Sequence, residues 1–415
     1  MTCEIPLLRF EQESEVCFLC NVKVLIIHQH FKTPSEGGAL RSYFLAKALA
    51  RQGSHPVVIT AGSDGIYKKT TVEDIEVHYL PVPYDNRFGF WRRGNSFLSF
   101  AWRSAMLAKR IPGITLCYAI SVPLTTGLTA TWLKRMLNIP FVFEVGDLWP
   151  DAPIAMGYVR NLFFQRFLYG LEASIYRQAT AVVALSAPIQ GAITDKIANK
   201  NVQVIPNMAD TEFFQPSSKD DAVFSQYQLQ GKFVVSYIGA VGVANGLDYF
   251  IECASASQRE KLPVHFLLCG DGAMIDQHKL SAKRLQLENF TFIPFLDREG
   301  VRSIMNVTDA VFVCYKPYRI LETGSPNKYF DGLAAGKLIL VNFEGWIKAE
   351  IESERCGRYI NREQPNDFVE VIKPFLTDRH LLQQFQRSAR QLAVQRYSRT
   401  MLSERYIQFL MDLKT

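Results

Sequence analysis

The sequence lacks the features that define several large classes of protein. It has no disulfide framework, because eight cysteines are scattered over 415 residues and several lie inside apolar runs. It has no strong charge excess, since 46 Lys and Arg against 40 Asp and Glu give a net charge of +6, less than an obligate nucleic-acid binder carries. With 48% hydrophobic residues, intrinsic disorder is also excluded. We therefore expect a globular protein with reduced thiols and no nucleic-acid partner.

A secretion signal and a membrane span are also missing from the pattern. Residues 1–20 carry four glutamates and no long apolar stretch, so we interpret them as a leader of uncertain structure. The uncharged run 114–133 is about the length of a membrane span, but its six Ser and Thr residues favour a strand, a loop and a helix. Cys17 and Cys20 have zinc-ligand spacing without a second pair, so no metal is expected. The predicted location is cytoplasmic.

Strand-like and helix-like segments alternate through the first half of the chain. Residues 22–28 form a continuous apolar run, which is typical of a strand buried on both faces. An apolar stripe over residues 40–49 predicts the helix that follows. Further strands are expected at 55–60, 75–82, 114–119, 139–145, 180–184 and 202–205. This alternation predicts a mostly parallel sheet with helices on both faces.

The alternation stops at residues 207–221, which are rich in turn residues and are interpreted as a linker. A second series of strands is expected at 233–238, 264–269, 290–294, 309–314, 338–342 and 357–360. The predicted fold is therefore α/β, with two doubly wound, Rossmann-like domains (21–206 and 222–396) facing each other across a cleft. Residues 397–415 are expected to form a C-terminal helix that packs back on the first domain.

Glycine-rich turns follow several of the expected strands. Such turns let backbone N–H groups approach a phosphate, although ordinary strand-to-helix turns are the alternative. The pattern G-x-G-x-x-G is absent, which argues against a nicotinamide oxidoreductase. Turns at successive strand ends instead suggest another nucleotide-sized ligand. The glycines concerned are Gly37, Gly38, Gly239, Gly242, Gly270 and Gly272.

The most informative segment is 322–337. Ser325 and Pro326 predict a capped helix start, whose free N–H groups suit a diphosphate. Lys328 and Asp331 lie three residues apart on one face of that helix. A cation near phosphate and a carboxylate for ribose hydroxyls suit a nucleotide. An ion pair between these two side chains is the alternative interpretation.

A basic aromatic segment runs from residue 84 to residue 103. Aromatic side chains interleaved with arginines on an amphipathic helix suit an anionic lipid surface. A core helix with solvated arginines is the alternative. We expect this segment to contact a membrane, or a substrate carried by it, through Arg87, Trp91, Arg92, Arg93 and Trp102.

In their order along the chain, these motifs resemble the retaining glycosyltransferases of family 4, which have the GT-B fold. The order is a Gly-Gly turn, I-P-N-x-x-D-T-x-x-F-x-P, G-x-x-G-x-x-x-G-L-D, G-D-G and S-P-N-K-x-F-D-x-x-A-A-G-K. The segment D-L-W-P-D at 147–151 narrows the resemblance to the bacterial branch that builds surface polysaccharide, O-antigen or capsule. That branch includes aminosugar transferases of the L-fucosamine type acting on lipid-linked acceptors.

The resemblance implies a UDP-sugar donor, with an N-acetyl aminosugar as the sugar, and a polyprenyl-diphosphate-linked saccharide acceptor. It implies a peripheral protein at the inner face of the cell membrane. Retention would proceed by front-face displacement, in which the leaving phosphate helps to deprotonate the acceptor hydroxyl. Neither a protein nucleophile nor a metal or other cofactor is then needed.

The resemblance also assigns roles to residues. Asp331 falls where the family contacts ribose, whereas the family's glutamate falls at Thr323 and this chain has Glu322 one position earlier. Arg and Lys residues that hold the diphosphate in many relatives correspond to Ala240 and Asn245, so Lys328 is expected to supply the charge. The catalytic candidates are Asp147, expected to orient the acceptor unless it caps a helix, and Glu322. The expected donor-binding residues are the six glycines above with Thr323, Gly324, Ser325, Pro326, Asn327, Lys328 and Asp331.

Two other functions fit a two-lobed architecture. A UDP-sugar 2-epimerase would share the fold but would not need an acceptor surface, so the basic aromatic segment argues against it. A non-enzymatic sugar-binding protein of two lobes would normally be secreted, and the missing secretion signal argues against it. The glycosyltransferase is therefore the leading expectation.

Overall fold

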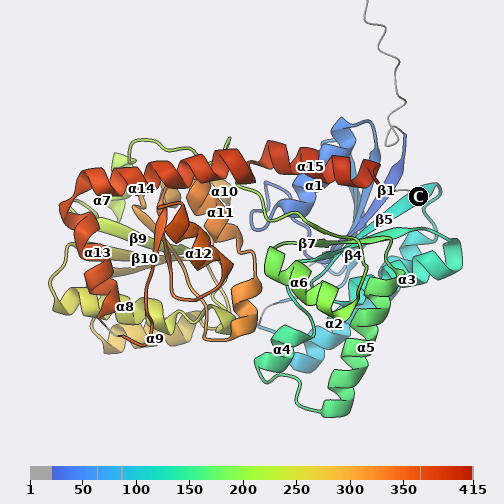
Figure 1. The fold of residues 1–415 in the computed structure, drawn as a ribbon, viewed down its shortest axis with the longest axis horizontal. Coiled ribbons are helices and arrows are strands. Elements are labelled where there is room, and N and C mark those ends of the chain that lie inside the picture. Colours follow the sequence, from blue (N-terminus) through green and yellow to red (C-terminus); the bar gives the residue numbers. More distant parts are fainter. Residues whose placement is uncertain (1–20, 63, 86, 365, 414–415) are drawn as a thin grey trace, which may run out of the picture.

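The structure is a computed structural model that describes residues 21–413 except 63, 86 and 365, so the expected leader and the Cys17–Cys20 pair lie outside the described residues. Two α/β domains lie next to each other along the long axis of the molecule, and the C-terminal helices run across one side of both (Figure 1). The predicted two-domain, doubly wound fold is confirmed.

The N-terminal domain has an eight-stranded sheet in the order β3-β4-β2-β1-β5-β6-β7-β8. All neighbouring strands are parallel except β3, which pairs antiparallel with β4 at the edge. The strands are β1 (Lys23–Ile27), β2 (His55–Gly62), β3 (Lys68–Val72), β4 (Ile75–Pro81), β5 (Ile114–Ile120), β6 (Phe141–Val145), β7 (Ala181–Ala184) and β8 (Val202–Val204). The sequence analysis missed β3, because this half-exposed edge strand of lysine, threonine and valine contains no apolar run.

Helices cover both faces of this sheet. The helices of the domain are α1 (Arg41–Arg51), α2 (Phe90–Ala108), α3 (Thr125–Leu137), α4 (Asp151–Ala155), α5 (Leu162–Gln178) and α6 (Ala187–Lys196). Apolar side chains of α2, α3, α5 and α6 fill the core on one face. On the other face, α1 packs together with the last helix of the chain, α15 (Arg399–Met411), which places Tyr406 and Leu410 in the same core.

The C-terminal domain has six parallel strands in the order β11-β10-β9-β12-β13-β14. They are β9 (Phe233–Ile238), β10 (Val264–Cys269), β11 (Phe290–Ile293), β12 (Ala310–Val313), β13 (Leu338–Val341) and β14 (Gly357–Tyr359). The helices are α7 (Asp221–Gln226), α8 (Asp248–Arg259), α9 (Ile275–Arg284), α10 (Arg298–Val307), α11 (Asn327–Ala334), α12 (Trp346–Ser353), α13 (Asp367–Thr377) and α14 (Arg379–Leu392). In both sheets the strand order reverses direction beside the first strand, where ligands of such folds bind.

A buried ion pair connects the N-terminal sheet to the segment by which the chain leaves this domain. Arg41 at the start of α1 donates from Nε and Nη2 to the two carboxylate oxygens of Glu144 in β6, both at 2.9 Å. Tyr118 of β5 donates to the same carboxylate. Arg41 also donates to the carbonyl oxygens of Ile205 and Pro206, where the chain leaves the domain. A two-pronged pair with these extra acceptors and donors satisfies both charges away from water.

We expect Glu144→Ala to lower the free energy of unfolding by about 3–5 kcal/mol, because it leaves the Arg41 guanidinium buried without its carboxylate. Urea denaturation followed by circular dichroism measures the change. Glu370→Ala is the control, since it removes only an exposed contact with Lys373 and leaves the midpoint nearly unchanged. Equal midpoints for the two variants would contradict this role of the pair.

Candidate functional site

Residues from both domains meet at the carboxyl ends of the two sheets. A Cβ atom placed on Gly37, in the loop after β1, would lie 3.5 Å from Phe295 Cζ in the loop before α10. Ser186, the N-cap of α6, donates to the carbonyl oxygen of Thr323 at 2.6 Å. A Cβ atom on Gly324 would lie 3.8 Å from Asp147 Oδ1. The structure thus brings the predicted Gly37 turn, Asp147 and the segment at 323–324 to one interface between the domains.

The start of α11 differs from the expectation in one respect. Pro326 is the N-cap of the helix, and no side chain caps it. Ser325 is not the cap, because its hydroxyl accepts from the backbone N–H of Asn207 and its carbonyl oxygen accepts from the Asn207 amide. Ser325 therefore connects the linker to the helix, while the first-turn N–H groups of α11 have no capping side chain. Such a helix start is suited to an anion.

Lys328 lies in the first turn of α11 and reaches the end of β9. Its ammonium group is 4.9 Å from the ring centroid of Tyr237, and a Cβ atom on Gly239 would lie 3.8 Å from Nζ. Burial lowers the pKa of Lys328 to about 8. Within the described part of the chain, no ion pair joins Lys328 to Asp331, so the alternative of a simple ion pair is wrong.

Asp331 lies one turn further along α11. Burial and the nearby Asp210 carboxylate raise its pKa to about 7, while Arg298 and Lys328 act in the opposite direction. Asp210 is itself buried and forms ion pairs with Arg298 and with Arg399, the latter at 2.7 Å. The carboxylate expected to hold ribose therefore shares its electrostatic environment with the contacts that join the domains. Sequence reasoning missed Arg298 because only the fold brings it to this site.

The two candidates for the sugar contact are placed differently. The Thr323 hydroxyl donates to the carbonyl oxygen of Ile320 at 2.7 Å and so is engaged within its own turn. Glu322 lies against Gly345, whose Cβ position would be 3.1 Å from Glu322 Cβ. Burial and the neighbouring Glu344 raise the pKa of Glu322. Of the two, only Glu322 keeps its polar side-chain atoms outside an internal hydrogen bond of the turn.

Two glycine turns of the C-terminal domain pack directly on each other. A Cβ atom on Gly270 would lie 2.0 Å from the Gly239 carbonyl oxygen, and one on Gly272 would lie 2.4 Å from that of Val241. Gly239 and Gly270 have φ values of +144° and +147°, which other residues rarely adopt. These glycines are thus required by contact between the two turns. In the first turn, the Gly242 N–H donates to the Asn245 side chain, at the position where relatives were expected to carry a cation.

Asp147 follows β6 and is an exposed residue. It does not cap a helix, because Pro150 is the N-cap of the next helix, α4, and no side chain caps it. The surrounding protein raises the pKa of Asp147 by desolvation. Its charge also raises the pKa of Tyr315 in the facing domain, whose burial is the larger cause. Asp147 is therefore a carboxylate held between the domains.

Two histidines at the end of β1 were not chosen from the sequence. His28 Nδ1 and Ser42 Oγ are 2.8 Å apart, and the His30 ring lies 4.5 Å from that of Tyr84. Burial lowers the pKa of His28 to about 3 and of His30 to about 4, so both imidazoles are neutral at physiological pH. The signal was present, since polar H-Q-H follows directly on a buried apolar strand.

The basic aromatic segment divides into two parts. Arg87 does not lie free for lipid, because it forms an ion pair with Asp271 of the second glycine turn, at 2.7 Å, across the two domains. Arg92 lies over the Phe88 ring at 3.7 Å, and Arg93 is half-buried. Trp91 and Trp102 are 86% and 66% exposed, so the alternative of a core helix is wrong for these two side chains.

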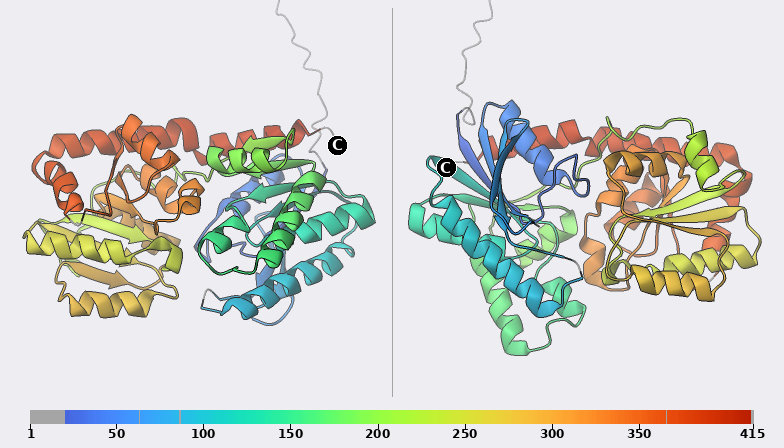
Figure 2. Two further views of the ribbon diagram at one scale, coloured as in Figure 1. Left: turned by 60° about the horizontal axis from the view of Figure 1, so that its bottom comes forward. Right: turned by 180° about the vertical axis from the view of Figure 1, so that it is seen from behind.

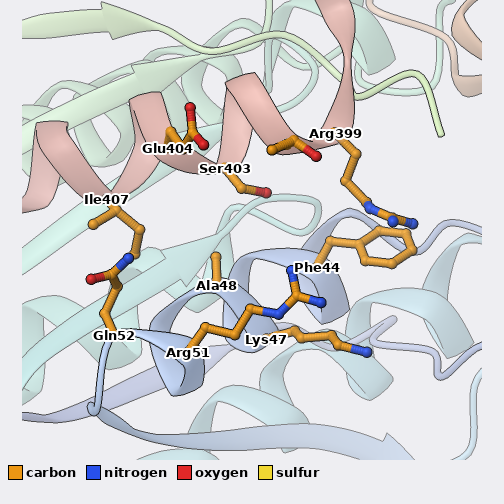
Figure 3. A pocket seen from close by; sticks show the side chains of 10 residues that line it. Phe44, Lys47, Ala48, Arg51, Gln52, Arg399, Ser403, Glu404 and Ile407 are labelled. Atoms are coloured by element: carbon orange, nitrogen blue, oxygen red, sulfur yellow. The ribbon is translucent and has the colours of Figure 1, made fainter. Parts of the chain in front are cut away.

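Outside the cleft, a pocket of about 180 Å³ lies between α1 and α15. Figure 3 shows Phe44, Lys47 and Arg51 of α1 facing Arg399 and Glu404 of α15. None of the predicted site residues lines it. Among the described residues, no group of three His, Cys, Asp or Glu side chains is arranged to hold a metal ion, and no helix is long and apolar enough to cross a membrane.

Both halves of the chain match known domain families. Residues 36–208 match the glycosyl transferase 4-like domain, and residues 219–392 match glycosyl transferases group 1. The chain is 25% identical to a probable glycosyltransferase, WbjE, of Pseudomonas aeruginosa over 52% of this chain and 54% of that protein. It is 20% identical to an alpha-D-kanosaminyltransferase of Streptomyces kanamyceticus over 85% of this chain and 94% of that protein. The chain thus spans about half the length of the first relative.

Solved structures share the fold at low sequence identity. Sucrose-phosphate synthase from Thermosynechococcus elongatus superposes with a TM-score of 0.76 and 16% identity, covering 95% of this chain and 99% of that one. Anabaena HepE, solved in complex with UDP and glucose, gives 0.70 and 17%, covering 94% and 100%. WaaG, a glycosyltransferase involved in lipopolysaccharide biosynthesis, gives 0.64 and 17%, covering 94% and 100%.

We expect Gly270→Ala to lower the stability of the C-terminal domain by about 1–3 kcal/mol, because the new methyl group overlaps the Gly239 carbonyl oxygen. Thermal unfolding monitored by differential scanning calorimetry measures the loss. Gly94→Ala in α2 is the matched control, since a Cβ there meets nothing within 4 Å and removes a helix-interior glycine. A Gly270→Ala variant as stable as Gly94→Ala would show that the two turns do not pack as described.

Proposed function

Because this chain is a glycosyltransferase of the GT-B fold, built from a glycosyl transferase 4-like domain and a group 1 domain, we propose that it moves a sugar from a UDP-sugar to a lipid-linked saccharide. The sugar is an N-acetyl aminosugar, the carrier is a polyprenyl diphosphate and the product enters surface polysaccharide, O-antigen or capsule. Two relatives support this class by name: the kanosaminyltransferase and a putative colanic acid biosynthesis transferase, WcaI, of Escherichia coli.

The donor assignment rests on one observation. The ammonium group of Lys328, at the start of α11, lies next to Gly239, which directly follows β9. A cation and uncapped N–H groups at one helix start form an anion site. The positions that hold the diphosphate in many relatives carry Ala240 and Asn245 here, and the Asn245 side chain is engaged by the Gly242 N–H. Lys328 thus supplies the positive charge that these positions lack. HepE, whose solved structure contains UDP, supports the nucleotide.

The proposed reaction needs positioning and charge stabilisation more than a protein nucleophile. Lys328 and the α11 N–H groups stabilise the diphosphate as it leaves, and Asp331 accepts hydrogen bonds from the ribose hydroxyls. A leaving phosphate oxygen takes the proton of the acceptor hydroxyl, which attacks the same face of the sugar, so that the configuration is retained. Asp147, held across from Gly324, orients that hydroxyl. No metal or cofactor takes part in this proposal.

The acceptor side of the proposal rests on α2. Trp91 and Trp102 are exposed, with Arg92 next to Trp91, and aromatic and cationic side chains of this kind bind the headgroup region of anionic lipid. We place the protein as a peripheral protein at the inner face of the cell membrane, where a polyprenyl-linked acceptor is found. Arg87 is not part of this surface, because it bridges the domains.

Release of UDP from UDP-N-acetyl sugars, measured with and without a polyprenyl-diphosphate-linked saccharide, tests the function. We expect release to depend on the acceptor, and Asp147→Asn to lower kcat by about 10²-fold without changing donor affinity. Glu370→Gln in α13, an exposed carboxylate on a helix that carries no predicted site residue, is the control. Interconversion of the UDP-sugar without UDP release would instead indicate a 2-epimerase, and product with inverted configuration would refute retention.

The two shifted groups on α11 predict how donor affinity depends on pH. Asp331 becomes a carboxylate above about pH 7, and Lys328 loses its proton above about pH 8. Affinity for UDP-N-acetylglucosamine, whose diphosphate does not titrate in this range, should peak between these values and fall by up to about tenfold per pH unit on either side. Isothermal titration calorimetry from about pH 6 to 9 measures the profile.

The variants of this pair separate the two limbs. Asp331→Asn should remove the acidic limb and keep the alkaline one. Lys328→Arg should remove the alkaline limb, because arginine keeps its proton throughout this range. Profiles that are unchanged in both variants would place the diphosphate and ribose elsewhere.

A further inference from the structure

The start of α5 carries a cluster of exposed apolar side chains that no part of the described chain covers. We define the α5 aromatic surface by its five residues, whose exposed fractions are 50%, 70%, 81%, 43% and 62%: Tyr158, Leu162, Phe163, Phe164 and Phe167. The core contacts of α5 come from its later turns, through Leu168, Ile175 and Tyr176. An exposed apolar surface of this kind indicates a site that binds a partner.

This surface is built on an ordered helix start. The Asn161 side chain caps α5 by accepting from the Phe164 N–H at 2.9 Å. The Phe164 and Phe167 rings stack on each other with centroids 6.2 Å apart instead of turning into the core. Figure 1 shows the α4–α5 region projecting from the N-terminal domain, away from the C-terminal helices. The rings are therefore held outward before any partner binds.

The charge around the surface indicates the class of partner. Residues 152–171 contain no Asp or Glu, and Arg160 and Arg166 are exposed within this stretch. Residues 88–110 of the α2 region likewise lack acidic residues and carry five Lys and Arg, without counting Arg87, which pairs with Asp271. Exposed aromatics with cations and without acids complement the anionic headgroups and apolar boundary of a bilayer.

Topology relates α2 to the α4–α5 region. The chain enters α2 after β4 and α4 after β6, so these two helices follow the carboxyl ends of their strands, and α4 packs against residues 319–323 of the other domain; α5 begins further out, after α4. Helices α2 and α5 pack on the same face of the sheet, with α3 between them. Figures 1 and 2 show them on one side of the domain. Trp91, Leu98 and Trp102 form the exposed stripe of α2.

We propose that the α5 aromatic surface inserts into the headgroup region of an anionic bilayer and acts with the α2 stripe as a two-point anchor. The anchor holds the mouth of the cleft against the membrane, where a lipid-linked acceptor can enter without leaving the bilayer. The choice of acceptor rests on the proposed function. The membrane contact itself rests on the exposed rings and the charge around them.

Vesicle flotation tests the anchor. The full chain is mixed with vesicles of phosphatidylglycerol and phosphatidylethanolamine in equal parts, and with vesicles of phosphatidylcholine alone. We expect the wild type to bind the anionic vesicles more tightly, and the double variant Phe163→Glu, Phe167→Glu to lose about tenfold or more in partitioning. The matched control is Leu280→Glu, Leu285→Glu on and after α9, which changes two exposed leucines of the C-terminal domain and should leave partitioning unchanged.

Three flotation results would overturn the proposal. They are a wild type that does not float with anionic vesicles, a phenylalanine variant that binds as well as the wild type, and an equal loss in the leucine control. Size-exclusion chromatography with light scattering tests whether a second copy of the chain binds this surface instead. A wild-type dimer that dissociates in the phenylalanine variant, with no binding to vesicles, would also contradict a lipid partner. Flotation needs no turnover, so binding of UDP-sugar, measured separately, shows whether a failure belongs to the anchor or to the proposed function.

Discussion

One buried carboxylate joins the parts on which the candidate site depends. Asp210 is 5% exposed in the linker between the domains and forms ion pairs with Arg298 at the start of α10 and Arg399 at the start of α15. Both arginines also lie near the Phe44 ring of α1. A charge buried in this way stabilises the protein only when its partners stay in place. The linker is therefore a fixed connection that sets how the two sheet edges face each other.

The same carboxylate affects the chemistry of the cleft. Asp210 raises the pKa of Asp331, and Arg298 opposes it, so the charge of the ribose candidate depends on the contacts between the domains. Burial lowers the pKa of Lys328, which lies on the same helix. Two groups whose pKa values have moved toward each other leave a narrow pH range in which both carry the charge that a nucleotide diphosphate needs. The charge state of the candidate donor site therefore depends on how the two domains are placed.

The N-terminal domain combines a rigid interior with an unusually apolar edge. Its sheet is held by the buried Arg41–Glu144 pair, whereas α2 and the start of α5 expose aromatic rings. Exposed rings lower solubility unless a partner covers them, and the arginines around them are the reason why the proposed partner is anionic. Arg87 bridges to Asp271 directly before α2, so the loop that leads into α2 also contacts the C-terminal domain.

Alternating buried runs and amphipathic helices determined the two-domain fold, because a strand buried on both faces must be apolar along its length, as residues 24–27 and 338–341 are. The order of the motifs indicated the glycosyltransferase class, and the Ser325-Pro326 pair indicated a helix start that the structure places at Asn327. Only the tertiary structure decided that Ser325 binds Asn207, that Arg87 binds Asp271 and that the rings at 162–167 point outward. Single polar pairs join residues more than a hundred positions apart and leave no periodic pattern. The sequence of an apolar cluster in a helix is the same whether the cluster faces the core or solvent, so the sequence alone does not distinguish the two.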